Sequence, residues 1–421
     1  MRRAYTLLLY VLMPWVLLRM AWRGLRAPGY WQRWPERFGL ISGAPKSASP
    51  TLWVHAVSVG EVQAAIPLIR ALRARFPLLD IVVTTTTLTG SERVQASLAQ
   101  DVRHYYAPYD LPGTVRRFLD HIQPQLLVVM ETEWWPNIFH GCHARNIPIV
   151  LANVRLSQRS AAGYARVRGL TTPMLSKVSA IAAQTRQDAE RLLQLGADAQ
   201  RIQVTGSVKF DIKLPASLRE EAAVLRRSWG VERAVWIAAS THEGEEKYIL
   251  DAFDAVKRTI PAALLVLVPR HPERFGKVAA LCARRGYTTV LRSEQRACGA
   301  QTEVFIGDSM GELNLFYAAA DVAFVGGSLV PTGGHNLLEP AALGIATITG
   351  PFMHNFEEIT RMLREEGAVR QIDNTDQLSG AVIAYLQDAN LRHAAGEKGR
   401  ALVERNRGAL DKLMQIVEGY L

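Results

Sequence analysis

Short apolar runs alternate with longer amphipathic segments along most of this chain. The segment 62–76 is typical of a helix because its apolar residues recur on one face. Those residues are Val62, Ile66, Ile69 and Leu72. Strands are predicted, in chain order, at 52–59, 81–87, 126–130, 147–152, 235–239, 264–268, 304–306, 321–325 and 345–349. Because strands alternate with helices, the pattern favours parallel sheets covered by helices on both faces.

The alternation pauses once, at 206–215, and then resumes. We therefore expect an α/β protein with two Rossmann-like, doubly wound domains that face each other across a cleft. The expected division is an N-terminal helix at 1–26, a first domain at 27–208 and a second domain at 209–421. The last helical region, from about Leu391, could return to pack on the first domain.

The first apolar segment, 4–22, has a different character. It approaches the roughly 20 residues that a membrane span needs, although Pro14 and Arg19 interrupt it. Arginines flank it on both sides, and no small-residue cleavage site follows, so a removed signal peptide is not expected. A retained single-pass anchor and a helix lying in the lipid interface both fit, with a buried helix of a soluble domain as the alternative. Either membrane interpretation places the body against a lipid surface, most simply the cytoplasmic face.

Composition and charge narrow the class of partner. The chain of 421 residues is long enough for two domains, and its formal charge of +10 favours an anionic partner. A nucleic-acid-binding protein should show clustered basic residues with interleaved aromatics, whereas the arginines here are dispersed. Cys142, Cys282 and Cys298 have no metal-binding spacing and fit a reducing compartment.

A glycine-rich loop in the second domain is the most informative motif. It begins at Gly326, after an apolar strand, and leads to a predicted helix with Asn336 and Glu339 in its first turn. Glycines let a ligand approach the backbone closely, and Glu339 could accept hydrogen bonds from ribose hydroxyls. A helix cap followed by an ordinary core helix is the alternative. The preceding strand–loop–helix unit has Met310, Gly311 and Glu312 at its helix start, where N–H groups could hold a phosphate.

Neither loop has the spacing of a dinucleotide fingerprint or of a P-loop. This favours a nucleotide that belongs to a donor substrate over a redox cofactor or ATP. Arg270 and His271, at the end of another strand, offer positive charge to such a nucleotide. Lys209 lies at the predicted domain junction and is a candidate to neutralise a departing phosphate, although a lone lysine is usually a solvated surface charge.

Carboxylates follow two strands of the first domain. Glu61 comes three residues after Ser58, a spacing that fits a capping box and equally a general base that takes a proton from a substrate hydroxyl. Glu131 and Glu133 are expected on one side of the chain, where like charges raise one pKa. A metal at this Glu-x-Glu pair is the less favoured alternative, because no further ligand is near in sequence. The loop 153–160 could bind acceptor phosphates through Arg155, Ser157, Arg159 and Ser160.

Nine blocks occur in one order over nearly the whole chain. They are WVHAVSVGE, TTTTLTGSERV, METEWWPN, LANVRLSQRSAAGY, TGSVKFD, STHEGEE, LVPRHPERF, GDSMGEL and GGHNLLEP. Together they resemble the 3-deoxy-D-manno-octulosonic acid (Kdo) transferases of lipopolysaccharide synthesis. The resemblance implies the GT-B fold and Kdo transfer from CMP-Kdo to the tetraacylated lipid A precursor at the cytoplasmic face of the inner membrane. No cofactor, metal or nucleic acid is implied.

The resemblance also implies residue roles. It makes Glu61 the general base, and Glu131 and Lys209 the residues that stabilise the transition state. The CMP contacts that it implies are Pro269, Arg270, Met310, Gly311, Glu312, Asn336, Leu337, Leu338 and Glu339. Another GT-B enzyme, such as a UDP-sugar transferase or a nucleotide-sugar epimerase, remains the alternative function, as does a non-catalytic basic protein at a membrane.

Overall fold

The computed structural model describes residues 1–26, 28–42 and 49–421, so residue 27, where the first domain is expected to begin, lies outside the described residues. The described chain forms two compact units. Unit 1 comprises Met1–Asp211 and Arg407–Leu421, and unit 2 comprises Ile212–Asn406. The domain boundary was expected after residue 208, and in the structure the chain passes from unit 1 to unit 2 after Asp211. The last helix, α17 (Ala409–Glu418), belongs to unit 1, whereas α16 (Ala389–Arg405) belongs to unit 2.

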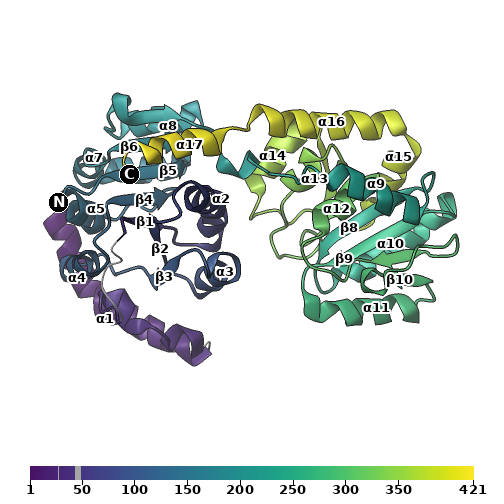
Figure 1. The fold of residues 1–421 in the computed structure, drawn as a ribbon, viewed down its shortest axis with the longest axis horizontal. Helices are drawn as coiled ribbons and strands as arrows, with labels where there is room; N and C mark the ends of the chain where they lie inside the picture. The colour runs from purple at the N-terminus through teal and green to yellow at the C-terminus, as the bar shows by residue number, and fades with distance from the viewer. Residues whose placement is uncertain (27, 43–48) are drawn as a thin grey trace. The chain divides into compact units, whose positions relative to one another are not determined.

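Unit 1 is built on a seven-stranded parallel sheet in the order β3-β2-β1-β4-β5-β6-β7 (Figure 1). Its strands are β1 (Thr51–His55), β2 (Asp80–Thr85), β3 (Arg103–Tyr106), β4 (Leu126–Met130), β5 (Ile149–Val154), β6 (Ala180–Ala183) and β7 (Ile202–Val204). Its helices are α1 (Arg2–Arg26), α2 (Val59–Arg75), α3 (Leu88–Leu98), α4 (Pro112–Ile122), α5 (Pro136–His143), α6 (Gln158–Arg166), α7 (Arg168–Leu175), α8 (Arg186–Gln194) and α17. Short 3-10 turns η1 (Pro28–Trp31), η2 (Trp34–Phe38), η3 (Ala199–Arg201) and η4 (Val208–Phe210) complete it.

Unit 2 repeats the architecture with the parallel order β10-β11-β9-β8-β12-β13-β14. Its strands are β8 (Val235–Thr241), β9 (Leu264–Pro269), β10 (Thr289–Leu291), β11 (Val304–Ile306), β12 (Val322–Val325), β13 (Ala346–Thr349) and β14 (Val369–Gln371). Its helices are α9 (Leu218–Trp229), α10 (Glu245–Thr259), α11 (Phe275–Arg284), α12 (Leu313–Ala319), α13 (Leu338–Ala342), α14 (Glu357–Glu365), α15 (Gln377–Gln387) and α16, with turns η5 (Pro272–Arg274) and η6 (Arg292–Glu294).

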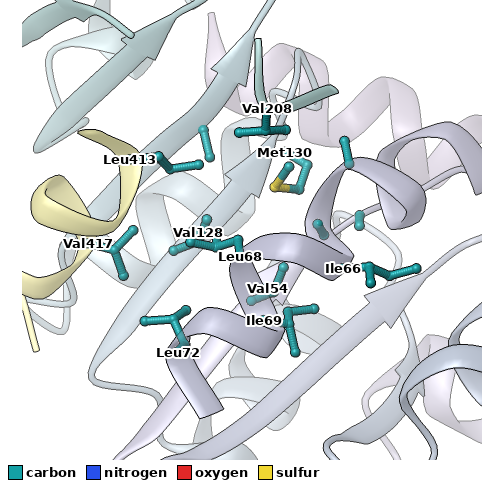
Figure 2. Packing of buried hydrophobic residues seen from close by; sticks show 14 of the residues in the cluster. Val54, Ile66, Leu68, Ile69, Leu72, Val128, Met130, Val208, Leu413 and Val417 are labelled. Atoms are coloured by element: carbon teal, nitrogen blue, oxygen red, sulfur yellow. The ribbon is translucent and has the colours of Figure 1, made fainter. Parts of the chain in front are cut away.

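The unit 1 core shows why the chain returns after residue 406. Leu413 and Val417 of α17 pack with Leu68 and Leu72 of α2 over Val128 of β4, all fully buried (Figure 2). The last helix thus covers the same sheet face as α2. Burying large apolar side chains contributes about 1.5–3 kcal/mol each, so α17 is part of the support of α2.

Several predicted boundaries differ from the structure, and two of them bear on the candidate sites. The strand expected at 52–59 ends at His55, because the chain turns at Ser58, the N-cap of α2, and the helix begins at Val59. Asn336 is not in the first turn of a helix, since α13 begins at Leu338 and the Asn336 side chain accepts a hydrogen bond from the Leu338 N–H (3.1 Å). Both differences come from side chains that bond to the backbone at helix starts.

Candidate active site

Glu61 lies in the first turn of α2 and is almost completely buried. Its carboxylate accepts hydrogen bonds from the Val57 N–H (2.7 Å) and the Ser58 hydroxyl (2.8 Å). The Ser58 hydroxyl also caps the helix by accepting from the Glu61 N–H (3.4 Å). The reciprocal bond of a capping box would go to the Ser58 N–H, whereas here it goes to Val57. Glu61 is thus held in one orientation at the carboxyl end of β1.

Burial raises the pKa of Glu61 to about 7, from an ordinary value of 4.5. The nearby carboxylates of Glu133 and, to a smaller extent, Glu131 contribute to this rise in pKa, while the bonds from Val57 and Ser58 oppose it. The anion-stabilising effect expected at a helix start is therefore outweighed. A carboxylate with a pKa near 7 can exist in both protonation states at neutral pH, which suits a general base.

Glu131 and Glu133 follow β4. Glu131 adopts a left-handed backbone conformation (φ 54°), which is strained for a residue with a side chain. Its carboxylate pairs with the Lys209 ammonium of η4 at 3.3 Å. Glu133 accepts a hydrogen bond from the Trp135 indole N–H (2.8 Å). Glu61, Glu131, Glu133 and Lys209 are called the Glu61 site below.

The position of Lys209 depends on residues from distant parts of unit 1. Asn153, in β5, also has a left-handed backbone (φ 55°), and its side-chain oxygen accepts from the Val208 N–H (3.2 Å). On the other side of η4, the Asp211 carboxylate accepts from the Gly408 and Leu410 N–H groups (2.6 Å each) at the start of α17. Neither contact is predictable from sequence spacing, because the partners lie 55 or more residues apart.

The four residues expected to bind an acceptor lie at the start of α6. Ser157 is the N-cap and accepts from the Ser160 N–H (3.1 Å), and the two hydroxyls also bond to each other (2.9 Å). Arg155 and Arg159 are exposed. The helix is joined to the loop after β4, because the Tyr164 hydroxyl donates to the Thr132 carbonyl (3.3 Å). This bond links the predicted acceptor segment to the loop that carries Glu131 and Glu133.

In unit 2, a buried carboxylate that the sequence did not single out organises the glycine-rich loop. Glu245, at the start of α10, accepts from the N–H groups of His242 (2.8 Å), Gly327 (2.7 Å), Ser328 (2.9 Å) and Leu329 (2.8 Å). Four N–H bonds to one carboxylate fix the loop after β12 against the end of β8. The signal in the sequence was the block STHEGEE, for which no role was predicted.

Arg270 follows β9, its own backbone N–H bonded to the Thr241 carbonyl (3.0 Å). Its charge, together with a hydrogen bond from Asn336 (3.1 Å), opposes the rise that burial causes in the pKa of Glu339. Two histidines, His242 and His335, lie close enough to Arg270 for its charge to lower their pKa values. The rings of His242 and His335 stack with centroids 5.0 Å apart, and their Nε2 atoms are 2.8 Å apart.

Burial, together with the nearby His242, Arg270 and His271, lowers the pKa of His335 to about 3. The histidine pair is therefore neutral at pH 7, with one ring donating to the other. His242, Arg270, His335 and Glu339 are called the Arg270 site. It combines one permanent positive charge with a half-buried carboxylate, a set that can bind a phosphate and the hydroxyls of a nucleotide.

The other residues expected to contact CMP differ in what they can offer. Leu337 and Leu338 are fully buried. Met310 is exposed, and Gly311 has a positive φ of 86°. Glu312 pairs with Arg292 at 2.7 Å and is already neutralised. Pro269 is the last residue of β9.

Within the described residues, no group of three or more His, Cys, Asp or Glu side chains is arranged to hold a metal ion. The Glu-x-Glu pair bonds instead to Lys209 and Trp135. The metal-free mechanism stays a prediction.

Solved structures identify the class of this fold. MurG from Acinetobacter baumannii has a TM-score of 0.56 over 88% of this chain and 99% of that chain, at 11% sequence identity. A UDP-GlcNAc 2-epimerase from Neisseria meningitidis bound to UDP-GlcNAc has a TM-score of 0.51 over 88% of this chain and 99% of that chain, at 12% identity. The two parallel sheets and these neighbours define a GT-B fold, so the fold prediction is confirmed.

Sequence relatives identify the family. A family model described as 3-deoxy-D-manno-octulosonic-acid transferase (kdotransferase) matches residues 32–212, and one described as glycosyl transferases group 1 matches residues 236–402. The 3-deoxy-D-manno-octulosonic acid transferase of Haemophilus influenzae is 44% identical over 99% of this chain and 98% of its own length. That of Bordetella pertussis is 36% identical over 100% and 99%. This chain belongs to the Kdo transferases, and it is a glycosyltransferase.

A further match is the C-terminal CMP-Kdo binding domain of WaaA from Acinetobacter baumannii. It is 35% identical and covers 48% of this chain and 100% of that chain, with a TM-score of 0.41.

Proposed function

We propose that this chain transfers Kdo from CMP-Kdo to the 6′-hydroxyl of the tetraacyldisaccharide 1,4′-bisphosphate precursor of lipid A, once or more, with inversion at the anomeric carbon. The proposal makes unit 1 the source of the base and of the acceptor contacts, and unit 2 the holder of the donor. The membership of the chain in the Kdo transferases supports the sugar, and the chemistry of the two sites supports the step.

The observation that carries the proposal is the raised pKa of the buried Glu61 carboxylate. A surface glutamate is fully ionised and weakly basic at neutral pH, whereas burial and two like charges raise the pKa of Glu61 to about 7. In the proposed step, the acceptor oxygen bonds to the anomeric carbon while the bond from that carbon to the phosphate oxygen of CMP breaks. The hydroxyl proton goes to Glu61, and the electron pair leaves with the phosphate.

The departing phosphate is already a competent leaving group and needs positive charge around it. Lys209, paired with Glu131, supplies one such charge, and Arg270 supplies another. Glu339 would accept hydrogen bonds from the ribose hydroxyls, and Asn336 holds its side chain (3.1 Å). No cofactor enters the step.

The acceptor carries two phosphates and four acyl chains, so it must be taken from a membrane. Arg155 and Arg159, with the hydroxyls of Ser157 and Ser160, are the residues that we assign to its phosphates. The segment 2–25 is long and apolar enough to cross a membrane by length and composition, and none of its most apolar window is buried. We therefore place the enzyme at the cytoplasmic face of the bacterial inner membrane, in contact with anionic lipid.

The test of the base is Glu61→Gln, which keeps the size and one hydrogen-bond acceptor. We expect its kcat to fall about 10²–10⁴-fold, the usual contribution of a general base, with CMP binding by calorimetry unchanged. Glu190→Gln, at an exposed position of α8, is the matched control and should keep full activity. Near-normal turnover of Glu61→Gln would remove Glu61 from this role.

The test of the donor compares CMP with UDP in thermal denaturation of the purified protein. CMP should raise the midpoint more than UDP does at equal concentration. Arg270→Met should abolish the difference. A larger effect of UDP would point to a UDP-sugar donor instead.

A further inference from the structure

The N-terminal turns of α1 are docked on unit 1. Arg2 donates to the side-chain oxygen of Asn137 (3.0 Å), and the Thr6 hydroxyl donates to the same atom (3.2 Å). The Tyr5 hydroxyl donates to the buried carboxylate of Asp110 (3.0 Å). Because Asp110 also accepts from the backbone of α5, at the Asn137 N–H (3.0 Å), these contacts fix the beginning of α1 to the start of α5.

The chain that follows the other end of α1 is held by the same unit. Arg33 contacts the His104 ring (Nη1 to Nδ1, 3.0 Å), and Arg37 donates to the Thr86 carbonyl (3.0 Å). Only six residues lie between the end of α1 at Arg26 and Arg33. The start of α1 and the chain that follows its other end are therefore both held by unit 1.

The sides of α1 differ along its whole length. Positions that are partly or fully covered recur at helical spacing on one side: Thr6, Leu9, Met13, Val16, Met20 and Gly24. Large apolar side chains that are 53–77% exposed recur on the opposite side: Leu8, Val11, Trp15, Leu18, Trp22 and Leu25. We call this second set the exposed stripe. A continuous apolar stripe of this length is out of place in water and fits a hydrocarbon boundary.

A membrane span would separate the two ends of α1. The hydrocarbon core is about 30 Å thick, so a spanning helix delivers its ends to opposite faces. Here the two ends are joined to the same folded body, whose α4 surface carries exposed Arg116, Arg117 and Asp120. Such a charged body cannot enter the core with the helix, because charged side chains there are very costly.

Positive charge lies beside the docked end of the helix. Five basic and no acidic residues occur between positions 155 and 177. Arg159, Arg166 and Arg168 of this stretch are exposed, and α6 has no buried residue. The stretch adjoins α1, since a side chain added at Gly169 would meet the Met1 sulfur. An apolar stripe next to basic side chains is complementary to an anionic lipid surface.

We propose that α1 is an in-plane anchor: its exposed stripe enters the acyl boundary, the basic stretch of α6 and α7 contacts lipid phosphates, and the helix does not cross the bilayer. The inference rests on the membrane association proposed above and specifies its geometry. A docked anchor would hold the start of α6, our assigned acceptor segment, at headgroup height.

Disulfide trapping tests the docking in membranes that contain the full-length enzyme. In a Cys298→Ser background, where the remaining Cys142 and Cys282 are buried, the pair Thr6→Cys and Asn137→Cys should cross-link on oxidation. The matched control is Leu8→Cys with Asn137→Cys, because Leu8 lies on the exposed stripe two residues away. We expect at least tenfold faster cross-linking of the Thr6 pair. Equal rates, or none for either pair, would overturn the proposal.

A second measurement does not disturb the docking contacts. Arg3→Cys, at an exposed position of the first turn, is treated in intact spheroplasts with a membrane-impermeant maleimide. The thiol should react only after detergent lysis, whereas modification in intact spheroplasts would show a spanning helix and overturn the proposal. Recovery of the protein in the soluble fraction would overturn it as well. Kdo transfer is assayed on the same membranes, so loss of transfer with trapping retained counts against the proposed function alone.

Discussion

Glu133 gives the sharpest test of how the Glu61 site is tuned. Its charge is the largest contribution after burial to the raised pKa of Glu61, and its own side chain is held by the Trp135 indole (2.8 Å). Glu133→Gln removes this charge and keeps an acceptor for Trp135. The pKa of Glu61 should therefore fall while the geometry of the loop persists.

The size of the effect follows from the shift of Glu61, from 4.5 to about 7, which corresponds to about 3 kcal/mol at 1.36 kcal/mol per pH unit. Glu133 contributes less than burial does, so a fall of about half to one unit is expected. With a pKa of about 7, about 9% of Glu61 is ionised at pH 6, and a fall of one unit raises this to about 50%. The rate at pH 6 should thus increase about threefold to fivefold.

The assay is kcat/KM for the lipid acceptor between pH 5 and 9, because its acid limb reports the base of the free enzyme. The acid limb of Glu133→Gln should lie at lower pH than that of the unsubstituted enzyme. Glu190→Gln removes an exposed charge elsewhere in unit 1 and should leave the limb in place. An acid limb that is unmoved in Glu133→Gln, or displaced to higher pH, would refute the account.

Three further outcomes are expected. Because the folded-state pKa of Glu61 lies above its unfolded value, ionisation costs stability as pH rises from 4.5 to about 7. Glu61→Gln should therefore raise the free energy of unfolding, measured by thermal denaturation, by up to about 3 kcal/mol at pH 8 and by little at pH 5. Glu245→Ala leaves four N–H groups without their carboxylate, so unit 2 should lose several kcal/mol of stability in denaturation and its CMP affinity in calorimetry. Glu243→Ala changes an exposed neighbour and should leave both the stability and the CMP affinity unchanged. Lys209→Met should lower kcat about 10²–10³-fold in transfer assays, with Lys209→Arg partly active, and equal rates for all three proteins would exclude Lys209 from the step.

The central strands could be predicted from the sequence because both of their faces are covered. Leu126–Met130 is continuously apolar and forms β4 with the predicted bounds. Strands at or near the sheet edges were missed, since Arg103–Tyr106 and Val369–Gln371 mix polar and apolar residues over only three or four positions. Such short mixed runs cannot be told from loops, and the pairing partner decides their state.

The location of the candidate residues followed from a topological rule, while their chemical state did not. Ligands bind beyond the carboxyl ends of parallel strands, and this places Glu61 and Arg270 where they were expected. The pairing of Lys209 with Glu131, 78 residues away, depends on Asn153 in a left-handed conformation. The sequence also could not show that burial, which raises the pKa of Glu61, outweighs the stabilisation of its anion at a helix start, because the extent of burial is known only from the three-dimensional structure.

The return of the chain to unit 1 has a consequence for synthesis. Residues 212–406 can fold as they leave the ribosome, but the unit that bears α1 and Glu61 stays incomplete until α17 emerges. Asp211 then finds its partners Gly408 and Leu410, and α2 gains its cover. A prematurely terminated polypeptide would retain a finished unit 2 and an unsupported α2, so, if Glu61 is the base as proposed, truncated copies should be catalytically silent.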